Sequence, residues 1–242
     1  MHNIKLKIEY DGTEYVGWQF QPNGKNIQNE IEKCLKQILQ EEITLIGAGR
    51  TDSGVHARGQ VANFKTNKTI DLKKIQNSLN SLLPDDIKIL DVQEVSLDFH
   101  SRYSAKSRFY TYYISTYPTA LFRNFSWYLK YDLNFELLNE CCKLVLGTHD
   151  FEGFSKLDEN NEHYLSNVYI SRWIFRKRFL KYQIEANRFL YGMVRGLVGS
   201  MIDVARGHMT LDDFIAVLDK KDRTKAGQFA PARGLFLENI KY

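Results

Sequence analysis

The chain has 242 residues, 43% of them apolar and 26% charged, close to the averages of soluble globular proteins. This composition argues against a disordered or fibrous chain, and the length suffices for one large domain or two small ones. The net charge of +4 tolerates a polyanionic partner without demanding one.

No apolar run reaches the length of a membrane span, and the first residues, MHNIKLKIEY, lack the hydrophobic stretch of a signal peptide. We therefore expect a cytoplasmic protein without a membrane partner. The three cysteines, Cys34, Cys141 and Cys142, form neither a zinc-binding spacing nor a disulfide framework. The six histidines are scattered singly, so we expect no metal ion.

The first half of the chain alternates predicted strands and helices. Apolar and polar residues alternate from Asn3 to Tyr10, which predicts a strand. Apolar residues then follow one helical face from Ile27 to Ile38, with Asn26 as the N-cap. The segment GQVANFKT predicts a strand, Asp71 to Leu83 a helix that Pro84 stops, and DIKILDV another strand.

The second half repeats this order. Predicted strands are RFYTYYIST, NVYISRWIF, LKYQIEA and GLFLENIKY; predicted helices run from Asn134 to Leu146, from about Leu190 to Ala205, and from Thr210, where Asp213 completes a capping box. The repeated order predicts an α+β fold of two similar α/β halves around a mixed, mainly antiparallel sheet. We place the halves at 1–103 and 104–242.

Aromatic residues make up 13% of the chain, and many lie beside Lys or Arg, as in KSRFYTYYI and SRWIFRKRF. This interleaving suits RNA, because aromatic rings stack on bases and cations hold phosphates. Ordinary strand packing explains the same composition.

One glycine-rich segment, GAGRTDSGVHARGQV, lies between two predicted strands and presents Asp52 from a turn. Arg50 beside it favours the ionised carboxylate, which can act as a nucleophile or a general base. A surface turn with hydrogen bonds from the Asp side chain explains these residues equally well. The segment lacks the last glycine of a dinucleotide fingerprint and the GK[ST] of a phosphate loop.

The segment GAGRTDSGVHARGQVANF closely resembles the signature of the TruA-type tRNA pseudouridine synthase family. The resemblance continues through EYDGTEYVGWQFQPNGKNIQNEIEKCL, LPDDIKI, DFHSRYSAKSRFYTYYI, HDFEGFSK, NRFLYGMVRGLVGSMIDVARG and AGQFAPARGLFLENIKY, and so covers nearly the whole chain. It implies two ferredoxin-like halves around a basic RNA-binding cleft, usually in a homodimer. It also implies isomerisation, without any cofactor, of uridines 38, 39 and 40 in the anticodon arm of tRNA.

The resemblance assigns roles to particular residues. Asp52 aligns with the catalytic aspartate and Arg195 with an arginine that pairs with it. Tyr110 aligns with a tyrosine that stacks on the base, and Leu235 with an apolar residue beside the base. With Arg50, these three residues are expected to bind the substrate. Composition alone would favour Tyr112 or Tyr113 as much as Tyr110, and strand packing explains Leu235 as well.

Three glycines, Gly192, Gly196 and Gly199, share a helical face with Arg195, which suggests close approach by another backbone or by the substrate. Tight packing of the helix on the sheet explains these glycines equally well. His56 and Arg58 are expected either to orient the Asp52 loop or to contact phosphate, and a solvated turn explains both residues equally well. The chain departs from many relatives at HYLSNVYIS, where they carry a basic Arg-Thr-Ile segment, so we expect its substrate contacts there to differ from theirs.

Two other classes of protein compete with this interpretation. A noncatalytic RNA-binding module explains the aromatic residues but not the Asp and Arg of the glycine-rich loop. A metal-dependent hydrolase would need clustered His and carboxylate side chains.

Overall fold

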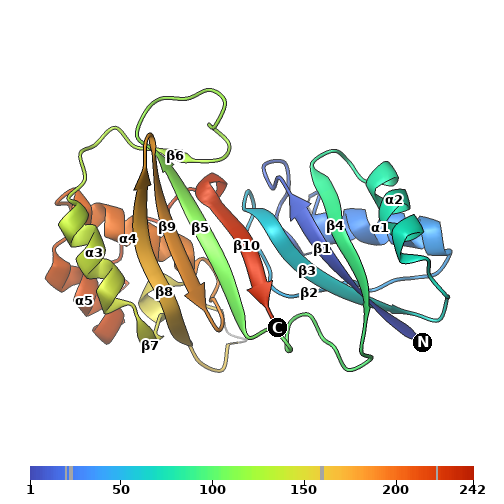
Figure 1. The fold of residues 1–242 in the computed structure, drawn as a ribbon. Coiled ribbons are helices and arrows are strands. Elements are labelled where there is room, and N and C mark those ends of the chain that lie inside the picture. Colours follow the sequence, from blue (N-terminus) through green and yellow to red (C-terminus); the bar gives the residue numbers. More distant parts are fainter. Residues whose placement is uncertain (20, 22–23, 159–160, 222) are drawn as a thin grey trace. The chain divides into compact units, whose positions relative to one another are not determined.

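The computed structural model describes residues 1–19, 21, 24–158, 161–221 and 223–242, in which helices alternate with strands (Figure 1). The chain forms two compact units: unit 1 comprises Met1–Lys106 with Phe236–Tyr242, and unit 2 comprises Ser107–Leu235. The C-terminal segment thus belongs to unit 1, whereas the predicted halves, 1–103 and 104–242, assign it to the second. The last strand joins unit 1 because Phe236 and Leu237 pair with residues of that unit.

Unit 1 contains β1 (His2–Tyr10), α1 (Ile27–Leu39), β2 (Ile46–Gly47), β3 (His56–Thr66), α2 (Leu72–Leu82) and β4 (Ile87–Val95). The strands lie in the order β4-β1-β3, with the short β2 next to β3, and all these pairs are antiparallel. A β-α-β-β-α-β chain in this order is ferredoxin-like, as expected. In addition, β10 (Leu235–Lys241) pairs parallel with β3.

The sequence patterns explain these elements. Ile4, Leu6 and Ile8 alternate along β1 and are at most 1% exposed, which gives the strand its buried face. The α1 helix begins after Asn26, whose side chain accepts a hydrogen bond of 2.9 Å from the backbone N of Asn29. It ends at Gln40, which adopts a left-handed conformation.

Unit 2 contains β5 (Ser107–Ser115), β6 (Trp127–Tyr128), α3 (Phe135–Leu144), β7 (Gly147–Asp150), β8 (Leu165–Arg176), β9 (Phe179–Ala186), α4 (Met193–Ala205) and α5 (Leu211–Lys220), with 3-10 turns at Glu152–Phe154 and Ala232–Gly234. Its strands lie in the order β5-β9-β8-β7, all antiparallel, and the short β6 pairs with β5. Both units combine helices with a mainly antiparallel sheet, so the predicted α+β class is confirmed.

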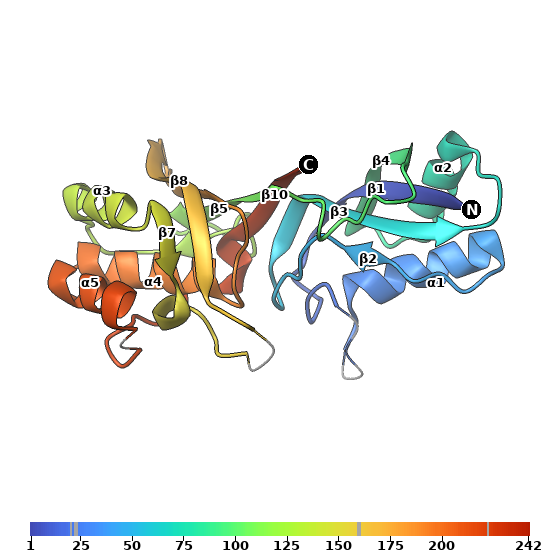
Figure 2. The same cartoon turned by 90° about the horizontal axis from the view of Figure 1, so that it is seen from below.

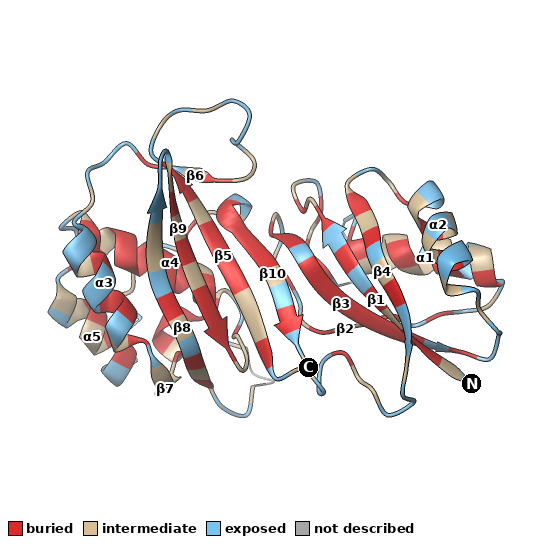
Figure 3. Ribbon diagram, viewed as in Figure 1, coloured by how far each residue is buried: buried red, intermediate tan, exposed pale blue. Residues whose placement is uncertain are grey.

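Buried residues alternate with more exposed ones along much of β8 and the first part of β9 (Figure 3). Tyr112, Ile114 and Tyr182 are wholly buried on one face, while Tyr113 and Lys181 lie partly exposed on the other. The α4 and α5 helices lie together on one side of these strands (Figure 2). Within the described part of the chain, no helix is both long and apolar enough to cross a membrane.

The α4 helix begins later than its sequence pattern suggested. It starts at Met193 instead of Leu190, because Gly192 takes a left-handed conformation with φ of 73° at the N-cap. The capping box predicted for the next helix is present, since Thr210 and Asp213 bond reciprocally.

Candidate active site

Asp52 lies in unit 1, in the loop that joins β2 to β3. The loop backbone is held at both ends, because the N–H of Trp18 donates to the carbonyl of Thr51 (3.2 Å) and the N–H of Gly54 donates to the carbonyl of Tyr15 (3.2 Å). The N–H of Val55 closes a tight turn on the carbonyl of Asp52 (3.1 Å). The turn leaves Asp52 half-buried. Such a position holds the residue in place and still leaves part of it open to a ligand.

Two glycines bring a neighbouring segment against this loop. Gly17 has φ of 111°, and a Cβ placed on it would lie 2.5 Å from the carbonyl O of Thr51. A Cβ on Gly12 would overlap the carbonyl of Val55. By contrast, a Cβ on Gly49, inside the GAGRTD segment itself, meets nothing within 4 Å. The close backbone contact thus depends on the glycines of EYDGTEYVGW. The sequence relates this segment to the Asp52 loop only through the resemblance.

A buried polar contact between side chains also holds the loop in place. The hydroxyl groups of Tyr10 and Thr51 lie 2.8 Å apart, and both residues are at most 7% exposed. The Tyr10 ring lies beside that of Trp18, with the centroids 6.1 Å apart. Thr51, the residue before Asp52, is therefore fixed by its side chain as well as by its backbone.

His56 follows the loop at the start of β3 and is 1% exposed. Its Nδ1 lies 3.1 Å from the backbone N of Gly12 and 3.0 Å from Oδ1 of Asp11. The N–H can only donate, so Nδ1 of the neutral ring accepts from Gly12; only a protonated Nδ1 would donate to Asp11. The ring stacks on Phe236 of β10, with the centroids 4.6 Å apart. This burial favours loop orientation over phosphate contact as the role of His56.

The two cations of this segment are exposed. Arg58 pairs with Glu238 through Nη1 (2.9 Å) and lies over the Phe236 ring at 4.4 Å. Arg50, in the loop itself, is exposed to solvent. An anionic ligand can therefore reach Arg50 next to Asp52.

In unit 2, Arg195 is fixed near the start of α4. Its Nε donates to the carbonyl of Ala230 (2.8 Å), and the N–H of Ala230 donates back to the carbonyl of Arg195 (3.0 Å). The guanidinium carbon lies 5.9 Å from the centroid of the Phe229 ring. This reciprocal pair fixes the direction of the guanidinium, which can pair with a carboxylate or a phosphate.

The glycines of α4 allow the backbone at Gln228 and at Phe154 to approach the helix closely. A Cβ on Gly199 would overlap the carbonyl of Gln228, and a Cβ on Gly196 would overlap the carbonyl of Phe154. Of the explanations offered by the sequence, close approach by another backbone is therefore the one observed at these positions. Gly192 lies outside the helix and serves as its N-cap.

The three candidate tyrosines of β5 have different surroundings. Tyr112 is wholly buried and donates its hydroxyl to the carbonyl of Pro231 (2.7 Å), which leaves no ring surface for a base. Burial raises its pKa, and the nearby Arg195 partly opposes this rise. Tyr113 is partly exposed beside Lys181. Tyr110 is 7% exposed and packs edge-on against Phe189, with the centroids 5.0 Å apart.

Leu235 is 6% exposed where β10 begins. It follows Gly234, which has no room for a side chain because a Cβ there would lie 2.6 Å from Cζ of Tyr112. The structure therefore places Leu235, Tyr110 and Arg195 in unit 2 and Asp52 and Arg50 in unit 1. Within the described residues, no three His, Cys, Asp or Glu side chains are grouped so that they could hold a metal ion.

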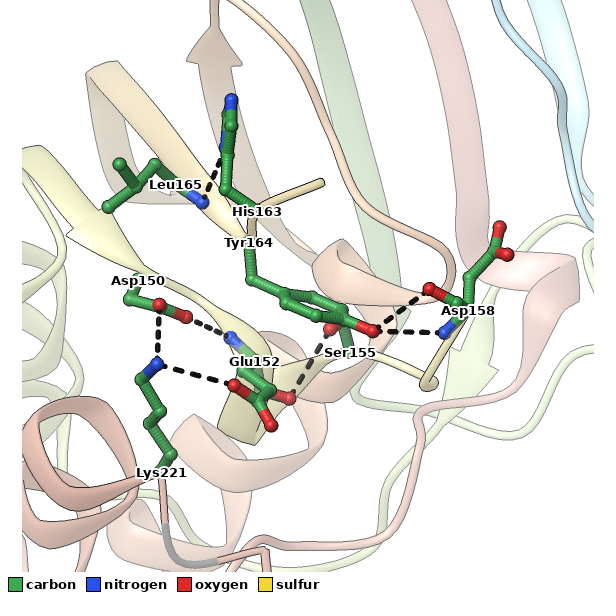
Figure 4. Close-up of polar contacts among 8 residues, drawn as sticks. All are labelled: Asp150, Glu152, Ser155, Asp158, His163, Tyr164, Leu165 and Lys221. Atoms are coloured by element: carbon green, nitrogen blue, oxygen red, sulfur yellow. Dashed lines mark hydrogen bonds and ion pairs between the residues drawn. The ribbon is translucent and has the colours of Figure 1, made fainter. Parts of the chain in front are cut away.

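A further polar cluster in unit 2 surrounds the HDFEGFSK segment (Figure 4). Lys221 reaches Asp150 (2.7 Å) and Glu152 (3.3 Å), and these hydrogen bonds raise the pKa of its ammonium. The Tyr164 hydroxyl donates to the carbonyl of Asp158 (3.1 Å). Sequence reasoning missed Lys221, because nothing in its local pattern distinguishes it from other lysines.

The divergent segment HYLSNVYIS leads into β8. His163 accepts a bond of 3.2 Å from the backbone N of Leu165, and Nη2 of Arg188 donates to Oδ1 of Asn161 (3.3 Å). An arginine from another segment therefore lies beside this stretch, which has no cation of its own.

Comparison with known proteins relates the whole chain to one family. A family model described as tRNA pseudouridine synthase matches residues 7–104 and 141–242. A tRNA pseudouridine synthase A from Chlorobium luteolum is 44% identical over 100% of this chain and 96% of its own length. Those of Thermoanaerobacter sp. and Clostridium acetobutylicum are 43% and 41% identical over the full length of both chains.

Proposed function

Because the chain belongs to the tRNA pseudouridine synthase family, whose members are isomerases, we propose that it converts uridine to pseudouridine at positions 38, 39 and 40 in the anticodon arm of tRNA. We propose Asp52 as its catalytic residue. The proposal includes a homodimer, as the resemblance implies, and a cytoplasmic location, as expected from the sequence.

The arrangement of the Asp52 loop carries the proposal. Both neighbours of Asp52 are tied down: Thr51 by Trp18 and Tyr10, and Ser53, whose hydroxyl donates to the carbonyl of Tyr15 (3.2 Å). A surface turn needs no such fixation of its flanking residues. A carboxylate that must reach one atom of a bound nucleotide does, because small displacements of a reacting group cost large factors in rate.

The reaction itself needs no redox partner. The bond between N1 of uracil and C1′ breaks, the base turns, and a bond forms between C5 and C1′; the proton on C5 is lost and N1 gains one. Three routes give Asp52 a part: attack on the sugar, attack on the base, or removal of a sugar proton. All three require an ionised carboxylate beside the nucleotide.

The reaction also requires the uridine to leave its stack, since a base cannot turn inside a helix. We propose that Tyr110 packs against the everted base, with Leu235 as an apolar neighbour. Arg195 is proposed as the charge partner of Asp52, and Arg50 as a second cation for the nucleotide. The register of the resemblance selects Tyr110 over Tyr112 and Tyr113, and the wholly buried Tyr112 ring has no face open to a base.

Tritium release from 5-tritiated uridine in an unmodified tRNA transcript tests the proposal. We expect release by the wild type without added metal, and a loss of at least about 10²-fold in Asp52→Asn, since the amide can neither attack nor accept a proton. Asp85→Asn is the matched control, because its carboxylate is fully exposed in the same unit. It should keep full activity.

Release by Asp52→Asn at the wild-type rate would remove Asp52 from the mechanism. Absence of release by the wild type, with tRNA binding retained, would favour a noncatalytic RNA-binding module. Mapping the pseudouridines in the product tests positions 38, 39 and 40, and sedimentation of the purified protein tests the homodimer.

A further inference from the structure

The tip of the β8–β9 hairpin in unit 2 carries exposed cations beside aromatic rings. We call this surface the hairpin patch; it consists of Arg176, Lys177, Arg178 and Phe179 from the hairpin, with Tyr117 and Phe122 from the segment after β5. Arg176, Lys177, Arg178 and Phe122 are exposed, and the other two are partly exposed. None of these residues has a part in the active site described above.

The patch is an ordered surface. The backbone N and the hydroxyl of Thr116 both donate to the carbonyl of Arg178, at 3.1 and 3.2 Å, and so attach the segment after β5 to the hairpin. The Phe179 ring lies edge-on to Tyr117 and Phe122, with centroids 5.9 and 5.3 Å apart. The guanidinium of Arg178 lies over the Tyr117 ring at 4.9 Å. These contacts fix the rings and one of the cations.

The charge around the patch has one sign. Residues 163–184 contain five Lys or Arg and no Asp or Glu, and residues 107–131 contain three and none. Within the described part of the chain, no carboxylate pairs with Arg176, Lys177 or Arg178. Three neighbouring cations without an internal counterion repel one another, and an external polyanion would relieve that repulsion.

The cationic and aromatic surface continues along the sheet. Lys181 shares a strand face with Phe179, while Leu180 between them is wholly buried on the opposite face. The Lys181 ammonium lies 4.9 Å from the centroid of Tyr113 on β5. An elongated ligand could therefore follow the sheet from the tip, with a cation next to an aromatic ring at each step.

The patch lies too far from Tyr110 to touch the same nucleotide. Ser115 pairs with Phe179 and Tyr110 pairs with Ile184, so the two places are separated by the strand from Tyr110 to Ser115. At a rise of about 3.3 Å per residue this distance is roughly 17 Å. In a nucleic acid helix, where each strand rises about 3.4 Å along the axis per nucleotide, it corresponds to roughly five nucleotides.

A second copy of the chain could also cover exposed rings, but two hairpin patches would bring cations against cations. We therefore propose that the hairpin patch binds the sugar-phosphate backbone of the tRNA several nucleotides from the target uridine. Arg176, Lys177 and Arg178 contact phosphates, and the exposed Phe122 ring packs against a sugar or an unpaired base. This inference rests on the proposed function for the choice of tRNA as ligand.

The test compares the triple variant Arg176→Gln/Lys177→Gln/Arg178→Gln with the wild type by filter binding of an unmodified tRNA transcript over a range of salt concentrations. We expect Kd to rise at least about tenfold, and the slope of log Kd against log salt to fall by about 2 to 3, because each lost phosphate contact removes about one unit. In tritium release, kcat at saturating tRNA should stay unchanged while KM rises.

The matched control is Lys36→Gln/Lys73→Gln/Lys74→Gln, which removes the same charge from exposed positions on α1 and α2. An equal loss of binding in both triple variants would overturn the proposal, because it would report net charge alone. Unchanged tRNA binding with a shift from dimer to monomer in sedimentation would also overturn it and identify the patch as a contact between copies.

Substitute variants and an assay that needs no turnover keep the test decisive. If circular dichroism shows that the triple variant is misfolded, the single variants Arg176→Gln and Lys177→Gln replace it, each with an expected slope change of about one unit. The binding assay does not depend on turnover. A wild type that binds tRNA through the patch but releases no tritium would refute the proposed function and leave this inference standing.

Discussion

Close backbone contacts at glycine hold both the Asp52 loop of unit 1 and the α4 helix of unit 2, which carries Arg195. In unit 1 the glycines lie in the segment that supports the loop, whereas in unit 2 they lie in the helix itself. In unit 1, Gly12 and Gly17 belong to the supporting segment, and the functional loop packs on them. In unit 2, Gly199 belongs to the functional helix, and the segment at Gln228 packs on it. In unit 1, therefore, only glycine fits in the segment that supports the Asp52 loop. In unit 2, only glycine fits in the helix that carries Arg195.

The two places also differ in what fixes the functional side chain. Around Asp52, backbone hydrogen bonds hold Thr51 and Gly54, and the carbonyl of Asp52 accepts from the N–H of Val55. Arg195 takes part in its own support, since its Nε donates to Ala230. We therefore expect a change in the supporting segment of unit 1 to move Asp52 through its loop. A change in the segment Gln228–Ala230 of unit 2 would instead remove a hydrogen bond of Arg195 itself.

Gly199→Ala should have the largest effect on stability. Inside a helix this change would ordinarily stabilise by about 1 kcal/mol. Here the added Cβ overlaps the Gln228 carbonyl, and we expect a net destabilisation of about 2 to 3 kcal/mol in urea unfolding. The shift of Gln228–Ala230 should also loosen Arg195 and lower kcat/KM in tritium release.

A stabilised Gly199→Ala variant would show that the segment at Gln228 yields easily, and the comparison between the two supports would then fail. Ser200→Ala is an informative neighbour. It removes only the hydroxyl that accepts the N–H of Gly227 (3.0 Å), at a cost of about 1 kcal/mol, and leaves the contact at Gln228 in place.

Gly17→Ala should have the next largest effect. The residue has φ of 111°, and its new Cβ would lie 2.5 Å from the carbonyl O of Thr51, so both backbone strain and overlap contribute. We expect a loss of about 2 kcal/mol in urea unfolding and a lower kcat with little change in KM. The matched control is Gly49→Ala, whose Cβ has open space; it should change neither quantity.

Sequence reasoning predicted the elements but not these supports. The strand at Asn3 to Tyr10 and the helix after Asn26 follow from periodicity and capping, which are local properties. The contact of Gly17 with Thr51 joins segments far apart in the chain, and no local pattern encodes it. The alternation in GLFLENIKY likewise predicted a strand, but its parallel pairing with β3, which places it in unit 1, depends on a partner that the pattern does not name.

The candidate site shows the same limit. Strand periodicity places Tyr110 and Tyr112 on one face, and only the contact of Tyr112 with Pro231 and its complete burial distinguish them. The glycines of α4 predicted a close approach correctly, since a helix seldom carries them without a packing reason. The approaching segment itself, Gln228–Ala230, became visible only in the fold.

The smallest expected effect, and the finest test of how Asp52 is held, comes from the pair Tyr10 and Thr51. Thr51→Val removes one hydroxyl at nearly constant volume, and Tyr10→Phe removes the other; each should cost about 1 kcal/mol in urea unfolding. The double variant should cost less than the sum of the two, by about 0.5 to 1 kcal/mol, because the groups bond to each other. If this bond positions the loop, kcat should fall equally in both single variants and no further in the double. Additive losses of stability would mean that each hydroxyl acts through other partners, and the bond between Tyr10 and Thr51 would then have no part in holding Asp52.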